Sequence, residues 1–77
     1  MQLEVRILTP LGERGGLRPQ TLQVQLGESA TVRDILSQLG AADDGSLTVL
    51  VNGRRRDGDH ALMPGDRVAV MRPMAGG

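Results

Sequence analysis

The chain contains no phenylalanine, tyrosine or tryptophan, no cysteine and no lysine. Without cysteine it has no disulfide, thiol nucleophile or thiolate metal site, and small secreted domains are often rich in cysteine, so we expect a cytoplasmic protein. Without lysine it cannot form a Schiff base through a side chain, and it offers no lysine to accept a modifier. Because nucleic-acid modules commonly stack bases on aromatic side chains, we expect no nucleic-acid partner.

Strong charge and long apolar runs are missing too. Nine arginines balance nine acidic residues, so the formal net charge is zero and gives no general attraction to nucleic acid or anionic membrane. No apolar run approaches membrane-spanning length. The N-terminal residues 1–6 lack the apolar region of a signal peptide. These features predict a protein without a membrane partner.

The chain has 77 residues, enough for one small domain. A domain of this size buries only about 60% of the surface that its unfolded chain exposes, which leaves little room for a walled active site. No nucleophile, base and orienting group occur together in the sequence. We therefore expect a protein that is not an enzyme.

Apolar and polar residues alternate in residues 3–8 and again in residues 21–26. This period of two predicts two half-buried strands. The segment between them, residues 9–19, is rich in glycine, proline and arginine, which is typical of a loop. The two strands are therefore expected to pair as a hairpin with a long connection.

The hydrophobic period changes after the second strand. Four apolar residues recur with the spacing of one helical stripe: Val32, Ile35, Leu36 and Leu39. Thr31 is placed to cap the start of this helix, with Asp34 three residues later, as in a capping box. Gly40 follows the last apolar position, where a left-handed C-terminal cap favours glycine. A short helix of roughly nine residues is predicted.

Strand and turn signals continue to the last apolar run. Residues 47–51 and 67–71 read as strands, and residues 54–56 as a short strand between them. The pair Asn52-Gly53 predicts a tight type I′ turn, and residues 63–66, with Pro-Gly at the centre, predict a type II turn. The order predicts an α+β domain over residues 1–72, with one helix packed across a sheet of four to five strands.

Residues 73–77 are expected to form a flexible tail after the last strand. Pro73 cannot donate a ladder hydrogen bond, so it should end the strand. Five extended residues reach up to about 17 Å, far enough to enter a partner's cleft. Gly76 and Gly77 have no Cβ and can pass through a narrow channel. Small residues at a terminus are also common without any function, which is the alternative interpretation.

The chain resembles the MoaD/ThiS family of sulfur carriers, which share the ubiquitin β-grasp fold with its mixed sheet. The resemblance covers nearly the whole chain. The residues that carry it are Thr31-Val32-Arg33-Asp34-Ile35-Leu36, Val49-Leu50-Val51-Asn52-Gly53, Leu62, Pro64-Gly65-Asp66-Arg67-Val68 and Gly76-Gly77.

The resemblance implies a function for the tail. In that family an enzyme of the ubiquitin-activating type uses ATP to adenylate the last glycine, which becomes a thiocarboxylate and gives its sulfur to a synthase subunit. Gly77 would be the carrier residue and Gly76 its neighbour, with Ala75, Met74 and Pro73 threading into the partner. No bound cofactor is implied. The long first loop looks more like the molybdopterin branch than the thiazole branch.

Two other functions remain open. Gly77 could be joined to a lysine of a target, as in a protein modifier, or the domain could be an interaction module that does not need its glycines. Partner docking is considered for an apolar residue on the outer sheet face and for four arginines: Leu50, Arg54, Arg55, Arg56 and Arg72. A solvated hairpin edge explains the arginine run as well.

Two weaker patterns carry no site. His60 with Asp57 and Asp59 falls short of a metal-ligand set, so no metal is expected. The glycine-rich segment 12–16 lacks Gly-Lys-Ser/Thr and does not open a helix, so it is interpreted as a loop.

Overall fold

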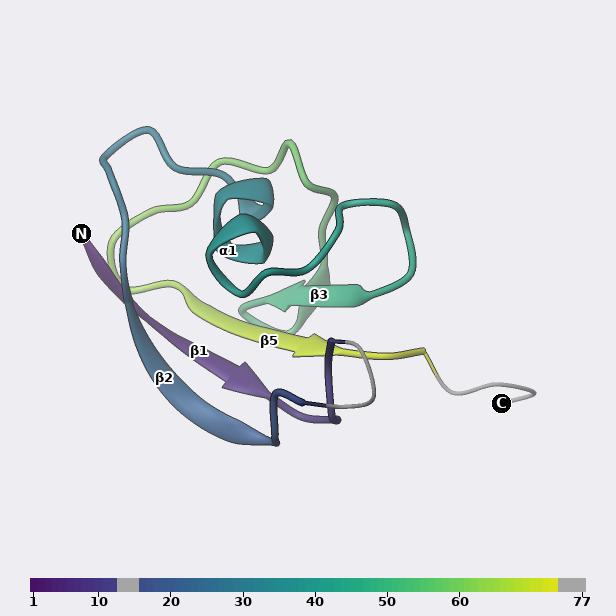
Figure 1. The fold of residues 1–77 in the computed structure, drawn as a ribbon. Helices are drawn as coiled ribbons and strands as arrows, with labels where there is room; N and C mark the ends of the chain where they lie inside the picture. Colours follow the sequence, from purple (N-terminus) through teal and green to yellow (C-terminus); the bar gives the residue numbers. More distant parts are fainter. Residues whose placement is uncertain (13–15, 74–77) are drawn as a thin grey trace.

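The computed structural model describes residues 1–12 and 16–73, which form one sheet and one helix (Figure 1). The elements are β1 (Gln2–Ile7), β2 (Gln20–Gln25), α1 (Val32–Gln38), β3 (Thr48–Val51), β4 (Arg54–Arg55) and β5 (Arg67–Met71). Each predicted strand is present, with its ends shifted by no more than one residue. The α+β expectation is therefore confirmed.

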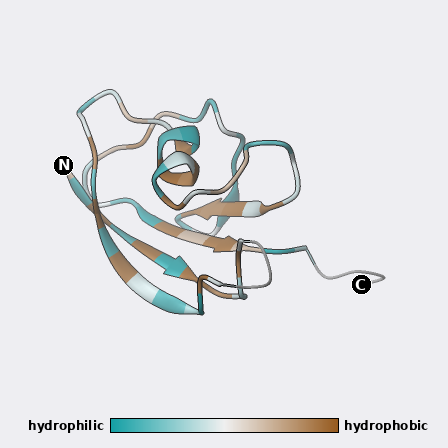
Figure 2. Cartoon of the chain, in the orientation of Figure 1, coloured by the Kyte–Doolittle hydropathy of each residue, from teal (hydrophilic) through white to brown (hydrophobic). Residues whose placement is uncertain are grey.

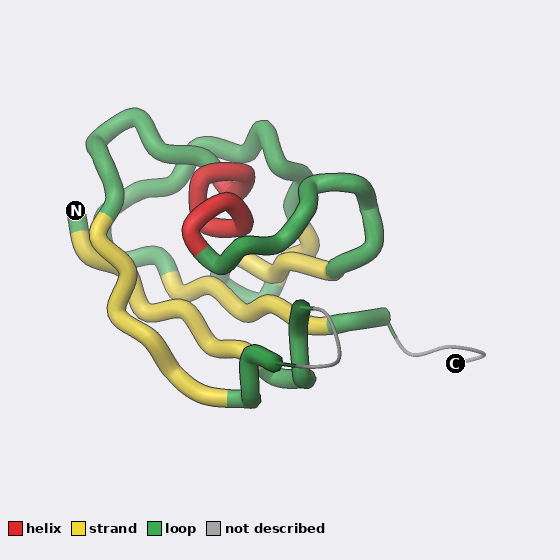
Figure 3. Tube along the Cα trace, in the orientation of Figure 1, coloured by secondary structure: helices red, strands yellow, loops and turns green. Residues whose placement is uncertain are grey.

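The five strands form one mixed sheet in the order β2-β1-β5-β3-β4. β1 and β5 run parallel at its centre, and the other pairs are antiparallel. The helix α1 lies across one face of the sheet, and no described element covers the opposite, open face (Figures 1 and 3). The N-terminal hairpin β1–β2 is confirmed, with Leu3 opposite Val24.

The core lies between α1 and the sheet, and alternating residues of the strands supply it. In β1 the side chains of Leu3, Val5 and Ile7 are almost fully buried, while Gln2 and Arg6 are exposed. The same alternation appears as bands of hydropathy along the strands in Figure 2. This packing fits the two-residue period expected of a sheet with one covered face.

The helix begins where its capping residue predicts, but it ends earlier than expected. The backbone N–H of Thr31 donates to the Asp34 carboxylate at 2.8 Å, so Asp34 has its predicted capping role. Leu39 already serves as the C-terminal cap, which leaves a helix of seven residues. Gly40 follows with a φ of 72°, as a left-handed cap requires.

Both predicted turns are present. Asn52 and Gly53 have φ values of 53° and 83°, as a type I′ turn demands. Gly65 has a φ of 88°, and the Asp66 N–H donates to the Met63 carbonyl at 3.1 Å. Within the described residues, no helix is long and apolar enough to cross a membrane.

Candidate functional site

The predicted tail begins at the end of a central strand. β5 is hydrogen-bonded on both sides, to β1 and to β3, and its Val68 and Val70 are at most 2% exposed. Because β5 is held on both edges, the point where the chain leaves the sheet is a rigid one. Pro73 is exposed and lies two residues beyond the last strand residue, Met71. Met74, Ala75, Gly76 and Gly77 lie outside the described residues.

Arg72 ties the start of the predicted tail to the loop after β1. Its backbone N–H donates to the Thr9 hydroxyl oxygen at 2.9 Å. Its guanidinium donates to two backbone carbonyls, from Nε to Pro10 at 3.1 Å and from an Nη atom to Gly12 at 3.0 Å. Since these partners are neutral, the positive charge of Arg72 is not cancelled by the contacts that hold it.

The loop that receives Arg72 is itself anchored in the domain. Leu11 is 1% exposed and belongs to the core. Leu11 and Leu17 exchange two backbone hydrogen bonds, at 2.9 and 3.0 Å, which close the base of the loop. The Leu8 N–H donates to the Val70 carbonyl at 2.9 Å and joins the loop start to β5. The loop after β1 therefore supports the end of β5 through hydrogen bonds. The sequence predicted this loop only as a connection between two strands.

Leu50 lies on the open face of the sheet. Its neighbours Val49 and Val51 are each 4% exposed and face the helix, while Leu50 is only partly buried. It helps to line a shallow depression of about 160 Å³, together with Glu4, Arg6, Gly53, Arg67, Val68 and Ala69. The predicted placement of Leu50 is correct, and the depression is a small apolar patch rimmed by charge.

The arginine run spans the edge of the sheet farthest from β2. Arg54 and Arg55 make up β4, and all three arginines are exposed. The Arg56 N–H donates to the Val49 carbonyl at 3.0 Å. β4 runs antiparallel to β3, and Thr48 of β3 pairs with Met71, so Arg56 lies at the same end of the sheet as the tail. Arg56 therefore lies nearer than Arg54 to the end of the sheet where the tail begins.

A second charged group surrounds the start of α1. Arg33 pairs with Asp43 at 2.7 Å and with Asp59 at 2.8 Å. The hydrogen bond to Asp43, followed by the one to Asp59, raises the pKa of Arg33 above its ordinary value. These two carboxylates serve an arginine and hold the loops around the helix. In the part of the chain that the structure describes, no three His, Cys, Asp or Glu residues are grouped to hold a metal.

The sequence did not predict Thr9, Pro10 and Gly12 as contacts of Arg72. Two of these three contacts are made by backbone carbonyls, which have no side-chain signature. They come from a point some 60 positions earlier in the chain, so no local pattern pairs them with Arg72.

Comparison with known proteins identifies similar chains. Residues 5–77 match the model of the ThiS family. SAMP1 of Haloferax volcanii, a small archaeal modifier protein, is 31% identical with a TM-score of 0.73, and the match covers 100% of both chains. No curated protein sequence matches the chain significantly.

Two further structures share the fold at lower identity. One is the complex of subunits 1 and 2 of the molybdopterin-converting factor from Helicobacter pylori, with 18% identity, a TM-score of 0.65 and coverage of 100% of both chains. The other is a ubiquitin from Caldiarchaeum subterraneum, with 15% identity, a TM-score of 0.61 and coverage of 100% and 98%. The β-grasp expectation is therefore confirmed.

Proposed function

The chain belongs to the ThiS family of small carrier proteins, which are not catalysts, and we propose that it carries sulfur as a thiocarboxylate on Gly77. The observation that carries this proposal is the family match, which runs through the glycine pair to residue 77. The anchored end of β5 supports it, because a rigid exit point lets a short tail reach a fixed depth in a partner.

The proposed chemistry has two steps. An oxygen of the Gly77 carboxylate attacks the α-phosphorus of ATP in an activating enzyme, which forms an acyl adenylate and releases pyrophosphate. Sulfide, as HS⁻, then attacks the Gly77 carbonyl carbon, AMP leaves with its bonding electron pair, and the resulting thioacid loses a proton to give the thiocarboxylate. Adenylation is needed because a free carboxylate is a poor electrophile. ATP is used by the partner and is not a cofactor of this chain. The cytoplasm, which supplies ATP, is the proposed location.

Two kinds of partner follow from this chemistry. The first is an adenylating enzyme of the ubiquitin-activating type. The second is a synthase subunit that accepts the sulfur, and we favour one of the molybdopterin type. The Helicobacter pylori relative supports this choice, since that structure is a complex of subunits 1 and 2 of the molybdopterin-converting factor.

The docking surface that we propose combines two features at the sheet. The patch around Leu50 offers a partly buried apolar contact on the open face. Arg55 pairs with Leu50 across β3 and β4, and Arg72 offers positive charge at the end where the tail begins. Both activating enzyme and synthase must hold the domain while the tail enters, so both are expected to use this surface.

One observation favours a second function. SAMP1, which is named a modifier protein, is 31% identical over the full length of both chains. The same Gly77 adenylate could be attacked by a lysine amine of a target, which would give an isopeptide bond in place of a thiocarboxylate.

Adenylation is the step that both functions share, and pyrophosphate exchange into ATP measures it. The full chain should support exchange with the activating enzyme of the same organism, while a chain that ends at Gly76 should not. Equal exchange by the two chains would contradict a role for Gly77. Detection of conjugates on target lysines, without thiocarboxylate, would favour the modifier.

A further inference from the structure

β2 is an outer strand of the sheet, and no described strand pairs with its outer edge (Figures 1 and 3). Its sequence, Gln-Thr-Leu-Gln-Val-Gln, contains no charge and no proline over six residues. Proteins usually protect an outer strand with charges, proline or short length. The opposite outer strand follows this rule, because β4 has only two residues and both are arginine. The unprotected edge is therefore confined to β2.

The hydrogen-bond pattern shows which groups of β2 face away from the sheet. The Leu26 N–H donates to the Met1 carbonyl at 2.7 Å, and the Met1 amino group donates to the Leu26 carbonyl at 2.6 Å. Since hydrogen-bonded and non-bonded pairs alternate along an antiparallel ladder, Val24, Leu22 and Gln20 also bond to β1. The backbone groups of Thr21, Gln23 and Gln25 must point outward.

Two contacts agree with this assignment. The Gln38 side chain donates to the Gln25 carbonyl from outside the sheet, at 2.8 Å. The Leu8 N–H bonds to β5, so the even-numbered residues of β1 face β5 and not β2. The outward ladder of β2 therefore consists of the N–H and carbonyl groups of Thr21, Gln23 and Gln25, of which the Gln25 carbonyl already accepts one bond from Gln38. Pro19, at the next outward position, has no N–H to extend it.

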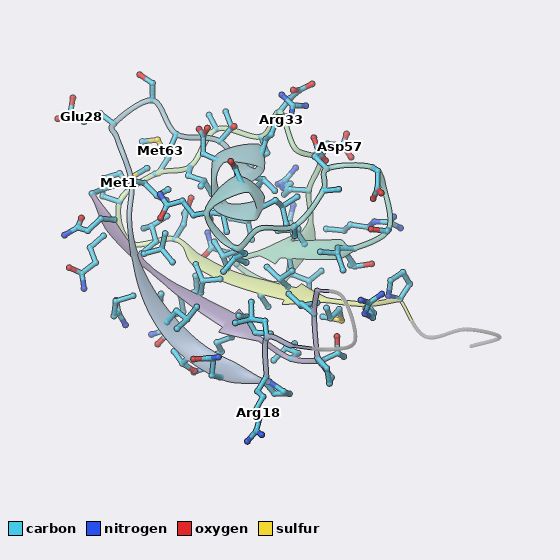
Figure 4. The ribbon with its side chains drawn as sticks, in the orientation of Figure 1. Met1, Arg18, Glu28, Arg33, Asp57 and Met63 are labelled. Atoms are coloured by element: carbon cyan, nitrogen blue, oxygen red, sulfur yellow. The ribbon has the colours of Figure 1, made fainter. Side chains whose placement is uncertain are left out.

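Charges of opposite sign stand at the two ends of this neutral edge. Arg18 precedes β2 and Glu28 follows it, and Figure 4 places them at opposite ends of the strand. Both residues are exposed. A second β2 that runs antiparallel, with Gln23 opposite Gln23, brings each Arg18 toward the Glu28 of the other copy. A parallel arrangement would instead put like charges together.

We propose that two copies of this chain pair through β2, which joins their sheets into one continuous sheet of ten strands. The two β2 strands run antiparallel and are related by a two-fold axis. Gln23 meets Gln23 on the axis, and Thr21 of each copy meets Gln25 of the other, whose carbonyl has a second lone pair beside the one that Gln38 uses. Each of these pairs joins outward-facing residues, so the two ladders fit without a shift of register. In the dimer both β2 edges are paired with each other. The only other outer strand of the sheet, β4, is too short to bind a further copy, so association stops at the dimer.

The dimer is compatible with a free tail but does not depend on the proposed function. β1 separates β2 from β5, so the junction lies two strands away from the point where the tail begins. A strand-to-strand contact is small by the standards of stable interfaces, and we expect a weak dimer that forms at high concentration.

Sedimentation velocity of the full chain, up to about 1 mM, tests the proposal. The weight-average mass should rise from 8.2 kDa toward twice that value. Gln23→Pro removes an outward N–H and no bond to β1, and should weaken association about tenfold or more. Gln23→Lys puts like charges together on the axis and should act in the same direction. Thr48→Lys, the same kind of change on β3, which β1 and β5 separate from β2, should leave association unchanged.

Charge exchange tests the register. Arg18→Glu and Glu28→Arg should each weaken the dimer, and the two changes together should restore it, with less effect at high salt. Amide exchange gives a second measurement that does not need a variant. Thr21 and Gln23 should become protected as concentration rises, while Leu22 and Val24 should be protected throughout.

Three results would overturn the proposal. The first is a mass that stays at 8.2 kDa over the whole range, which would leave the edge to a strand of another protein. The second is association that Gln23→Pro and Gln23→Lys leave intact while circular dichroism shows a folded chain. The third is assembly beyond two copies.

Discussion

The backbone N–H of Arg72 donates a hydrogen bond to the Thr9 hydroxyl oxygen at 2.9 Å, across 63 positions of the sequence. The Arg72 guanidinium adds bonds to the carbonyls of Pro10 and Gly12. The end of β5 is therefore held by the loop after β1 as well as by the sheet. If the tail enters a partner, this contact fixes the position of Arg72, from which the tail extends.

Loss of the Thr9 hydroxyl tests the backbone half of this contact. Thr9→Val removes the acceptor and keeps the shape, while Thr9→Ser keeps the acceptor. One hydrogen bond is worth about 1 kcal/mol, so Thr9→Val should slow adenylation by up to about fivefold. Thr9→Ser should behave like the natural chain. Pyrophosphate exchange measures both, and equal rates for the two variants would contradict the role of the hydroxyl.

Arg72 can act through its hydrogen bonds or through its charge, and two substitutions separate these roles. Arg72→Lys keeps the charge but lacks the planar fork that reaches two carbonyls. If Arg72 positions the tail, Arg72→Lys and Arg72→Gln should both reduce adenylation by up to about thirtyfold, the value of two neutral hydrogen bonds of about 1 kcal/mol each. Full activity of Arg72→Lys beside an inactive Arg72→Gln would instead assign Arg72 to docking on an acidic surface.

Leu50 and Val49 are neighbours in β3 whose side chains lie on opposite faces of the sheet. Substitutions of Leu50 should therefore affect partner binding, and substitutions of Val49 should affect stability. Leu50→Arg should weaken binding to the activating enzyme and leave the thermal midpoint nearly unchanged, because Leu50 lies on the open face. Val49→Ala should reduce the free energy of unfolding by about 2 kcal/mol and leave binding intact, because Val49 is 4% exposed. Calorimetric binding and thermal denaturation check the pair. Normal binding by Leu50→Arg would remove Leu50 from the docking surface.

Asp44 provides a prediction on pH. The hydrogen bond from the Ser46 side chain, with another from its backbone N–H at 2.9 Å, holds the pKa of Asp44 below its ordinary value of 3.8. A lowered pKa in the folded state stabilises the fold above pH 3.8, and this contribution is lost as pH falls through the folded value.

Ser46→Ala should therefore raise the pKa of Asp44 toward its ordinary value, while Ser46→Thr should preserve the shift. Titration followed by carboxyl chemical shifts measures it. An unchanged pKa in Ser46→Ala would show that the hydroxyl makes no contribution.

The elements of the fold could be predicted because their signals are local. Asn52-Gly53 requires positive φ at both positions, and Thr31 with Asp34 marks the start of a helix, whatever the rest of the chain does. The end of the helix could not be predicted to the residue, because Leu39 belongs to the apolar stripe and yet acts as the cap. Element ends depend on such competition between packing and capping.

The parts of the site that could not be predicted depend on contacts between distant segments. The first loop has turn-forming residues and no hydrophobic period, so its packing through Leu11 and its bonds to Arg72 had no local signal. The open edge of β2 likewise follows from the strand order, which its own sequence does not specify. The predicted tail residues Met74, Ala75, Gly76 and Gly77 carry the proposed chemistry from outside the described residues.

The most direct test of the sulfur-carrier function is an intact mass spectrum of the untagged chain. The protein is incubated with ATP, a sulfur donor and the activating enzyme of its own organism, beside a chain that ends at Gly76. Our account predicts a mass gain equal to the replacement of one oxygen by one sulfur, present in the full chain and absent from the shortened one. An unchanged mass in the full chain, under conditions in which pyrophosphate exchange proceeds, would contradict it.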